Sequence, residues 1–151
     1  MAQGTFKKVG KSKKHMYGQP GLLVCGLTPD EHDPLLMLLE QNTFQDLPVI
    51  FATDGDSSKI LKELFTLEHR AGLGKVSEMQ RAIIMSGFTQ KELHHLMAIY
   101  RLAEMPPTLW ATLTPISENW TLSQLLNELT AESEAMKRQK DRLKSYTHKQ
   151  E

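Results

Sequence analysis

Two runs of consecutive hydrophobic residues, Leu22–Cys25 and Ala82–Met85, lead almost directly into a glycine. A continuous apolar run ended by glycine is typical of a strand that is buried on both faces. Two residues after each glycine stands a threonine, with a glutamate three residues further on and leucines at helical spacing beyond it. Threonine and glutamate at this spacing form the capping box that begins a helix. The pattern therefore predicts a strand, a tight turn and a helix, twice along the chain.

Each predicted helix is followed by a second hydrophobic run and a shorter amphipathic segment. The second strands are expected at Val49–Thr53 and Leu109–Thr112, each just after a proline. The closing helices carry their hydrophobic residues at Ile60, Leu61, Leu64 and Phe65, and at Leu122, Leu125, Leu126 and Leu129. Two buried strands joined by a helix indicate a parallel crossover. Each half of the chain is thus predicted to be a β-α-β-α unit.

A unit of about fifty residues is too small to cover both faces of its own two strands. We therefore predict an α/β fold in which two β-α-β-α repeats share one small, mostly parallel four-stranded sheet. The favoured order places Leu22–Cys25 beside Ala82–Met85 in the centre. One residue disturbs the first helix: Pro34 either kinks it or marks its true start, with Asp33 as the cap.

The charge distribution divides the chain into three parts. Residues 1–20 contain five lysines and no acid, residues 21–130 carry −7, and residues 131–151 carry +2. We expect a basic flexible arm (1–20), one α/β domain made of repeat 1 (21–65), a linker (66–80) and repeat 2 (81–130), and a charged helical tail (131–151). In the last helix Leu122, Leu129, Met136 and Leu143 stand seven residues apart, which predicts a thin apolar seam that could form a homo-oligomer.

Composition narrows the class of protein. The chain is 40% hydrophobic and 24% charged, as in globular domains, and no apolar run approaches the roughly 18 residues that span a bilayer. The apolar stretch before Gly26 is also too short for a secretory leader, which needs about seven such residues. Cys25 is the single cysteine, which excludes an internal disulfide. We expect a cytoplasmic protein that does not associate with membranes.

Three stretches carry a family resemblance: Ile84–Thr89, Trp110–Pro115 and the helix Trp120–Leu129. With them, residues 21–130 resemble a small prokaryotic family, number 3783, known only as a domain of unknown function. The resemblance implies the α/β fold. It brings no reaction, ligand, cofactor or catalytic residue with it.

The candidate ligand site lies where strands lead into helices. The turns at Gly26 and Gly87 would place two helix N-termini at the carboxyl edge of the sheet, where backbone N–H groups can bind an anion. We favour the simpler interpretation that Thr28 and Thr89 are helix caps.

The second part of the candidate site is the loop before the last helix. Aligning the two Ala-Thr pairs gives repeat 2 six extra residues there, rich in hydroxyl, acid and amide groups. Alternatively, Trp120 fills the core and Asn119 or Thr121 caps the helix. The candidate ligand-binding residues are Gly26, Thr28, Gly87, Thr89, Thr112, Thr114, Ser117, Glu118, Asn119 and Trp120.

No other pattern points to chemistry. Asp54 and Asp56 end a strand as Mg²⁺ ligands can, although capping by Asp56 is favoured. Adjacent His94 and His95 lack the spacing of a zinc helix, and Ser86 lacks the glycine of a nucleophile elbow. We therefore predict no catalytic residues and no metal site, and the sequence identifies no cofactor.

Two functions fit these sequence patterns. The first is a non-catalytic interaction or regulatory module, with a homo-oligomer formed through the C-terminal helix. The alternative is a protein or enzyme that binds a small anion or nucleotide in a cleft at the carboxyl edge of the sheet. A nucleic-acid partner for the basic arm ranks third.

Overall fold

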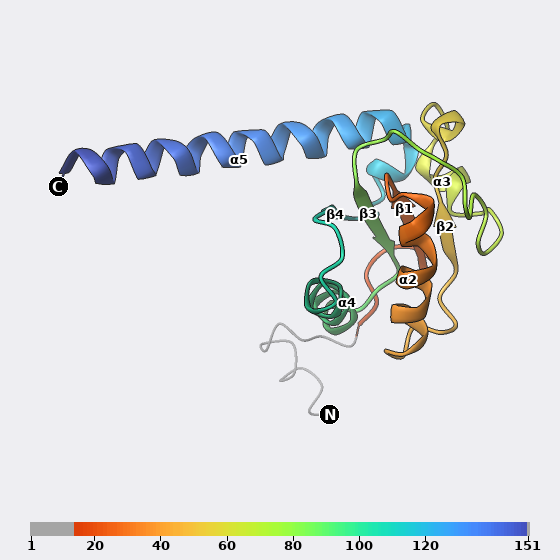
Figure 1. Ribbon diagram of the computed structural model, residues 1–151. Helices are drawn as coiled ribbons and strands as arrows, with labels where there is room; N and C mark the ends of the chain where they lie inside the picture. Colours follow the sequence, from red (N-terminus) through yellow and green to blue (C-terminus); the bar gives the residue numbers. More distant parts are fainter. Residues whose placement is uncertain (1–13, 151) are drawn as a thin grey trace, which may run out of the picture.

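The computed structural model describes residues 14–150, with side chains as far as residue 144. Its centre is a four-stranded sheet in the order β2-β1-β3-β4 (Figure 1). The strands are β1 (Gly21–Cys25), β2 (Val49–Phe51), β3 (Ala82–Ser86) and β4 (Leu109–Thr112). The predicted α/β class and the central position of β1 beside β3 are both confirmed.

The two halves of the sheet run in opposite directions. β1 pairs with β2 in parallel and β3 with β4 in parallel, whereas the central pair β1–β3 is antiparallel. Gly21 lies opposite Ser86, and Cys25 lies opposite Ala82. Because the strand direction reverses between β1 and β3, the carboxyl end of β1 lies beside the amino end of β3.

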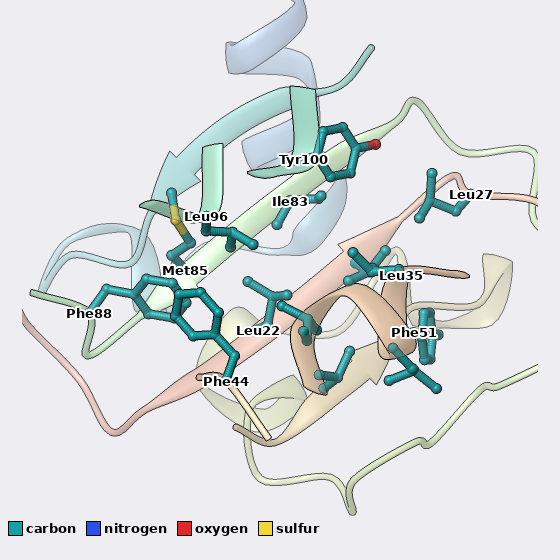
Figure 2. Packing of buried hydrophobic residues seen from close by; sticks show 14 residues of the cluster. Leu22, Leu27, Leu35, Phe44, Phe51, Ile83, Met85, Phe88, Leu96 and Tyr100 are labelled. Carbon is teal, nitrogen blue, oxygen red and sulfur yellow. The ribbon is translucent and has the colours of Figure 1, made fainter. Parts of the chain in front are cut away.

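Helices cover both faces of the sheet. α2 (Pro29–Glu40) and α4 (Gln90–Leu102) pack on one face, and α3 (Leu61–Leu64) and the start of α5 (Leu122–Gln150) pack on the other. On the first face Leu22, Ile83 and Phe51 meet Leu35 of α2 and Leu96 of α4 (Figure 2). Each such side chain contributes about 1.5–3 kcal/mol when fully buried. β1, β2 and β3 are fully buried, so packing on both faces of the sheet stabilises the fold.

Pro34 lies inside α2, which runs from Pro29 to Glu40. The alternative start of this helix at Pro34 is therefore wrong. A proline at this position lacks the N–H that would donate to the carbonyl of Asp30, one turn earlier.

Some pairs between the two halves join residues that are sixty-one positions apart in the chain. Leu23 pairs with Ile84 in the centre of the sheet, and Ile60 forms an isolated bridge with Thr121. The pairing of Leu22 with Val49 recurs as that of Ile83 with Trp110. An approximate two-fold relation of the halves accounts for these pairs, while their origin as a sequence repeat stays a prediction.

The same register corrects the predicted alignment of the two halves. Because Val49 corresponds to Trp110, Thr53 corresponds to Thr114 rather than to Thr112. Thr53 and Thr114 then stand equally far from the helices α3 and α5. The six extra residues assigned to the second half do not exist. The Ala-Thr alignment was two residues out of register and accounts for only two of them, and the two connections have equal length in the structure.

The predicted arm lies partly on the body of the protein. The N–H of Met16 donates to the carbonyl of Phe88 (2.8 Å), and the N–H of Gly87 donates to the carbonyl of Tyr17 (3.0 Å). The prediction that residues 1–20 form a flexible arm is therefore wrong for Met16 and Tyr17, which are hydrogen-bonded to the body. Four of the five lysines predicted to make it basic lie outside the described residues.

The C-terminal helical extension is confirmed. α5 leaves the body beside β4 and projects away from it as a single helix (Figure 1). Side chains from residue 131 to 144 are all exposed. Within residues 14–150 no helix combines the length and the apolar character that crossing a membrane requires.

Candidate functional site

The two glycine turns follow the antiparallel strands β1 and β3 and therefore lie beyond opposite ends of the strands. Gly26 has a φ of +78°, and a Cβ there would meet the carbonyl oxygen of Met79 at 2.6 Å. Gly87 has a φ of +70°, and its Cβ would meet the carbonyl oxygen of Gly18 at 2.6 Å. A single cleft containing both turns is therefore wrong, because the central strands are antiparallel.

Both helix N-termini are closed by their own glutamates. The N–H of Thr28 donates to Glu31 Oε1 (2.8 Å), and the N–H of Thr89 donates to Glu92 Oε1 (2.8 Å). The N–H of Glu92 donates in turn to Thr89 Oγ1 (3.1 Å). A carboxylate already occupies the position that a bound anion would take at each helix. These turns act as caps in the structure, which is the interpretation favoured from the sequence.

The loop after β4 satisfies its own polar groups. The N–H of Thr114 donates to Ser117 Oγ, and the N–H of Ser117 donates to Thr114 Oγ1, both at 3.0 Å. Glu118 accepts a hydrogen bond from the hydroxyl of Tyr17 (2.7 Å), and this bond raises the pKa of Tyr17. The reciprocal pair of Thr114 and Ser117 shapes the 3-10 helix η3 (Ser117–Asn119).

Trp120 and Thr121 take the structural roles that were considered for them. Trp120 packs against the second hydrophobic cluster, and its carbonyl accepts from the N–H of Leu61 (3.0 Å). Thr121 Oγ1 accepts from the N–H of Gln124 (3.1 Å) and so caps α5. Asn119 is exposed. One end of the strands carries the candidates Gly87, Thr89 and Thr112–Trp120. The opposite end carries Gly26 and Thr28.

Asp54 and Asp56 are both held by neighbouring groups. Asp54 accepts from the hydroxyl of Ser77 (2.9 Å) and the N–H of Glu78, and Asp56 accepts from the N–H of Thr53 (2.8 Å). Burial alone would raise the pKa of Asp56, but the hydrogen bonds from Thr53 and the nearby Lys59 ammonium (3.0 Å) hold it below its ordinary value. Asp56 thus completes the capping box of the 3-10 helix η2 (Asp54–Asp56), whereas the predicted cap of the following helix is wrong, because α3 begins after Ile60 without a side-chain cap. Among the residues with described side chains, no three acidic, histidine or cysteine groups converge on a metal site.

Two buried titratable groups also have structural roles. Burial raises the pKa of the Cys25 thiol to about 12, so it carries no thiolate near neutral pH. His32 stacks on Phe51 with ring centroids 4.2 Å apart and accepts the N–H of Gly74 at Nδ1 (3.0 Å). The histidine thus fastens the segment after α3 to α2, a role the sequence did not reveal.

The two outer strands of the sheet, β2 and β4, differ in the partners of their outward N–H groups. At the β2 edge, the N–H of Val49 donates to His69 Nδ1 (3.0 Å) and that of Phe51 to the carbonyl of Ala71 (2.8 Å). The corresponding residues of β4 are Trp110 and Thr112. Since Leu109 and Leu113 donate inward to β3, alternation along the strand turns the N–H groups of these two outward. No partner for either group lies in the described part of the chain.

Two hollows flank this open strand. One, of about 580 Å³, lies between β4 and α5 and is lined by Leu109, Trp110, Leu129, Met136 and Lys140. The other, of about 320 Å³, lies between β4 and the end of α4 and is lined by Tyr100, Arg101, Met105 and Trp110. Trp110 borders both hollows. The hydrophobic pattern had presented β4 as a buried strand, yet all four of its residues are partly exposed.

The second half of the chain carries the family relationship. Residues 81–136 match a family model described as Domain of unknown function (DUF3783). The match begins just before β3 and ends within α5, so it leaves out the first half of the predicted resemblance. No match was found among curated proteins or among solved structures. Over residues 81–136, the chain is therefore similar to the domain of unknown function DUF3783.

Proposed function

We propose that the chain is a non-catalytic interaction module and that it binds a protein partner at the surface formed by β4 and α5. We define this β4–α5 surface as residues 108–112 together with residues 129–140. The observation that carries the proposal is the open edge of β4 beside a hollow of about 580 Å³, which is lined by both apolar and charged residues. The single buried Cys25 fits a reducing compartment such as the cytoplasm.

An open edge strand is a ready template for another chain. Unpaired N–H and C=O groups in a row can bind an added strand, and proteins usually cover such edges or make them short and charged. β2 is covered by the segment that follows α3, as the hydrogen bonds of Val49 and Phe51 show. β4 instead consists of Leu109, Trp110, Ala111 and Thr112 and contains no charged residue. This difference supports a binding role for β4.

The polar groups at the earlier candidate site support the non-catalytic part of the proposal. Thr89, Thr114 and Ser117 bond within their own turns, and Glu118 is held by Tyr17. A catalytic nucleophile or base needs a free group within reach of a substrate. These side chains stabilise the fold instead.

Photo-crosslinking in the producing cells tests the surface. A benzophenone amino acid replaces Met136, which is 66% exposed, or Val76, which is 73% exposed and lies in the segment between α3 and β3. We expect a discrete covalent adduct from position 136 and none from position 76. Val76 is the matched control because it is an equally exposed apolar residue. Equal labelling at both positions, or no adduct at position 136, would contradict the proposal.

A second candidate function is the binding of a small anion in the hollow beside α4. Its volume of about 320 Å³ is that of a small ligand site, and Arg101 contributes a positive charge to its lining. A panel of anions and nucleotides should then raise the melting temperature, and Arg101→Gln should abolish the rise. A rise that is lost instead in Asn119→Ala with Trp120→Ala would place the ligand at the loop after β4.

A further inference from the structure

We propose that the partner at the β4–α5 surface is a second copy of this chain, and that the two α5 helices pack antiparallel with Met136 at the two-fold axis. This inference rests on the proposed function and names its partner. It goes beyond the thin heptad seam, because the direction and the register of the helix pair follow from the charges along α5.

α5 extends far beyond the core that it packs against. Leu122, Leu125 and Leu126 are buried against the sheet, whereas Met136 and Leu143 are 66% and 60% exposed. An isolated helix is only marginally stable in water, and its stability in proteins comes mostly from packing one face. The body of the protein therefore leaves Met136, on the outer half of α5, largely exposed.

Charges along α5 change sign at Met136. The acidic residues Glu128, Glu132 and Glu134 precede it, and the basic residues Lys137, Arg138, Lys140, Arg142 and Lys144 follow it, with Asp141 as the single acid among them. Among the described side chains, the ion pairs lie in the body and none lies along α5. The outer part of the helix is thus an acidic stretch followed by a basic one.

An antiparallel pair matches these two stretches. With Met136 at the axis, Glu132 comes level with Lys140 of the second copy, and both lie within about 40° of Met136 around the helix because successive residues turn by about 100°. Glu134 and Arg138 also come level, but they point about 160° away from Met136 and lie outside the contact. By the same geometry, Leu129 lies level with Leu143 of the second copy, so apolar residues meet apolar residues. A parallel pair would align each charge with its like, which is unfavourable. The sequence of α5 is therefore complementary to itself in the antiparallel direction alone.

The same axis brings the second copy to the open strand. Met136 and Lys140 line the hollow against Leu109 and Trp110, so a helix packed on Met136 also lies beside β4. Figure 1 shows α5 running out past β4 rather than back over the sheet. The chain already uses two-fold antiparallel pairing between β1 and β3, where Leu23 lies opposite Ile84. A two-fold dimer at β4 would cover the outward N–H groups of Trp110 and Thr112.

Charge reversal tests the pairing in the purified full-length chain. Sedimentation equilibrium should show a dimer, and Glu132→Lys should weaken it at least tenfold by placing lysine opposite Lys140 in both helix contacts. Adding Lys140→Glu should restore the dimer because the charges of each pair are then exchanged. Asp141→Arg is the control, since its opposite position is the uncharged Ala131, and it should change the dimer little. Failure of the double variant to recover, with the wild type dimeric, would refute the register.

Cysteine cross-linking tests the direction. Met136→Cys should form a disulfide-linked dimer under mild oxidation, whereas Leu143→Cys should not. In the antiparallel pair the two residues 143 are about 21 Å apart along the axis, at 1.5 Å per residue. Cys25 is buried and serves as an internal control. Equal cross-linking of both variants would indicate a parallel pair and overturn the inference.

The two proposals fail separately. A chain that stays monomeric at all concentrations refutes the second copy as partner. If position 136 still gives a discrete adduct with a different protein in cells, the interaction module stands while this inference falls. If position 136 gives no adduct and the chain is monomeric, both fall.

Discussion

At the scale of single residues, the turns after β1 and β3 depend on the absence of a side chain. Gly26 and Gly87 both adopt the left-handed backbone region, and each faces a backbone segment leading into the neighbouring central strand. For Gly26 the nearest atoms are the carbonyl oxygen of Met79 and the backbone nitrogen of Arg81, at 2.6 and 2.7 Å from a Cβ built there. Backbone atoms cannot move aside as a flexible side chain can. The glycines thus allow close approach in addition to the turn.

Gly26→Ala should destabilise the fold more than Gly74→Ala does. Gly74 has a φ of +80° with no atom within 4 Å of its Cβ position, so alanine there loses only about 1–2 kcal/mol for its left-handed backbone. Gly26→Ala adds the clash with Met79 and Arg81 to the same backbone cost. Urea unfolding of the two variants measures the difference. Equal losses would show that close approach at Gly26 does not matter.

His32 makes stability depend on pH. Burial lowers its pKa from 6.5, although the Leu27 carbonyl and the nearby acids Asp33 and Glu31 act in the opposite direction. The folded chain therefore takes up this proton at lower pH than the unfolded chain does. As pH falls below about 6.5, the unfolded state binds more protons and the free energy of unfolding decreases.

His32→Phe provides the comparison for this pH dependence. Phenylalanine keeps a ring against Phe51 but loses the hydrogen bonds to Leu27 and Gly74, so the variant starts less stable. Its free energy of unfolding should fall less steeply between pH 7 and pH 5 than that of the wild type. Chemical unfolding at several pH values gives both curves. Parallel curves would assign the pH dependence to other groups.

At the scale of elements, β2 and β4 occupy corresponding places but end differently. The segment after α3 returns along β2, where Arg70 donates to Val49 and Ala71 accepts from Phe51. The corresponding part of the second half continues as α5 and leaves the sheet (Figure 1). Within residues 14–150, β4 is therefore an open edge strand, because the segment that corresponds to the cover of β2 is helical.

A proline scan along β4 should reveal the open edge. Thr112→Pro removes an N–H that points outward, and its cost should be about 1 kcal/mol or less. Ala111→Pro removes an N–H that alternation directs to β3 and puts a ring between the strands, so it should cost about 3 kcal/mol or more. Thermal unfolding compares the two. Similar losses would mean that the outward side of β4 is already paired.

At the scale of the whole molecule, the sheet is the middle of three layers. β1 places Leu22 in the cluster under α2 and α4, and Leu23 in the cluster under α3 and α5. Both side chains have no exposed surface. Stability therefore depends on both helical layers together.

Leu22→Ala and Leu23→Ala should each lower the free energy of unfolding by about 2–5 kcal/mol, because each leaves a cavity in a different layer. Leu102→Ala is the control, since that side chain is 81% exposed and the change should stay within about 0.5 kcal/mol. Urea unfolding measures all three. A small effect of Leu23→Ala would mean that α3 and α5 do not seal their face of the sheet.

Much of the candidate site was predictable only as local structure. Thr89 with Glu92, and Thr121 before Leu122, are caps that the sequence indicates because the residues involved are neighbours in the chain. Their assembly into one cleft was wrong for Gly26 and Thr28, since no local pattern reports whether two distant strands run in the same direction. His32 was missed because its partner Gly74 lies forty-two residues away.

The sequence by itself determined the strands, the helices and their caps, because hydrophobic periodicity and capping act over a few residues. It favoured β1 beside β3 without fixing the strand order, which the structure gives. Only the tertiary structure decided the antiparallel centre, the register that relates Val49 to Trp110, and the open edge of β4. These depend on how distant segments pack and on where α5 leaves the body. The physical reason is that contacts between distant residues set the strand directions and decide whether an outer strand is covered. No local sequence pattern encodes such contacts.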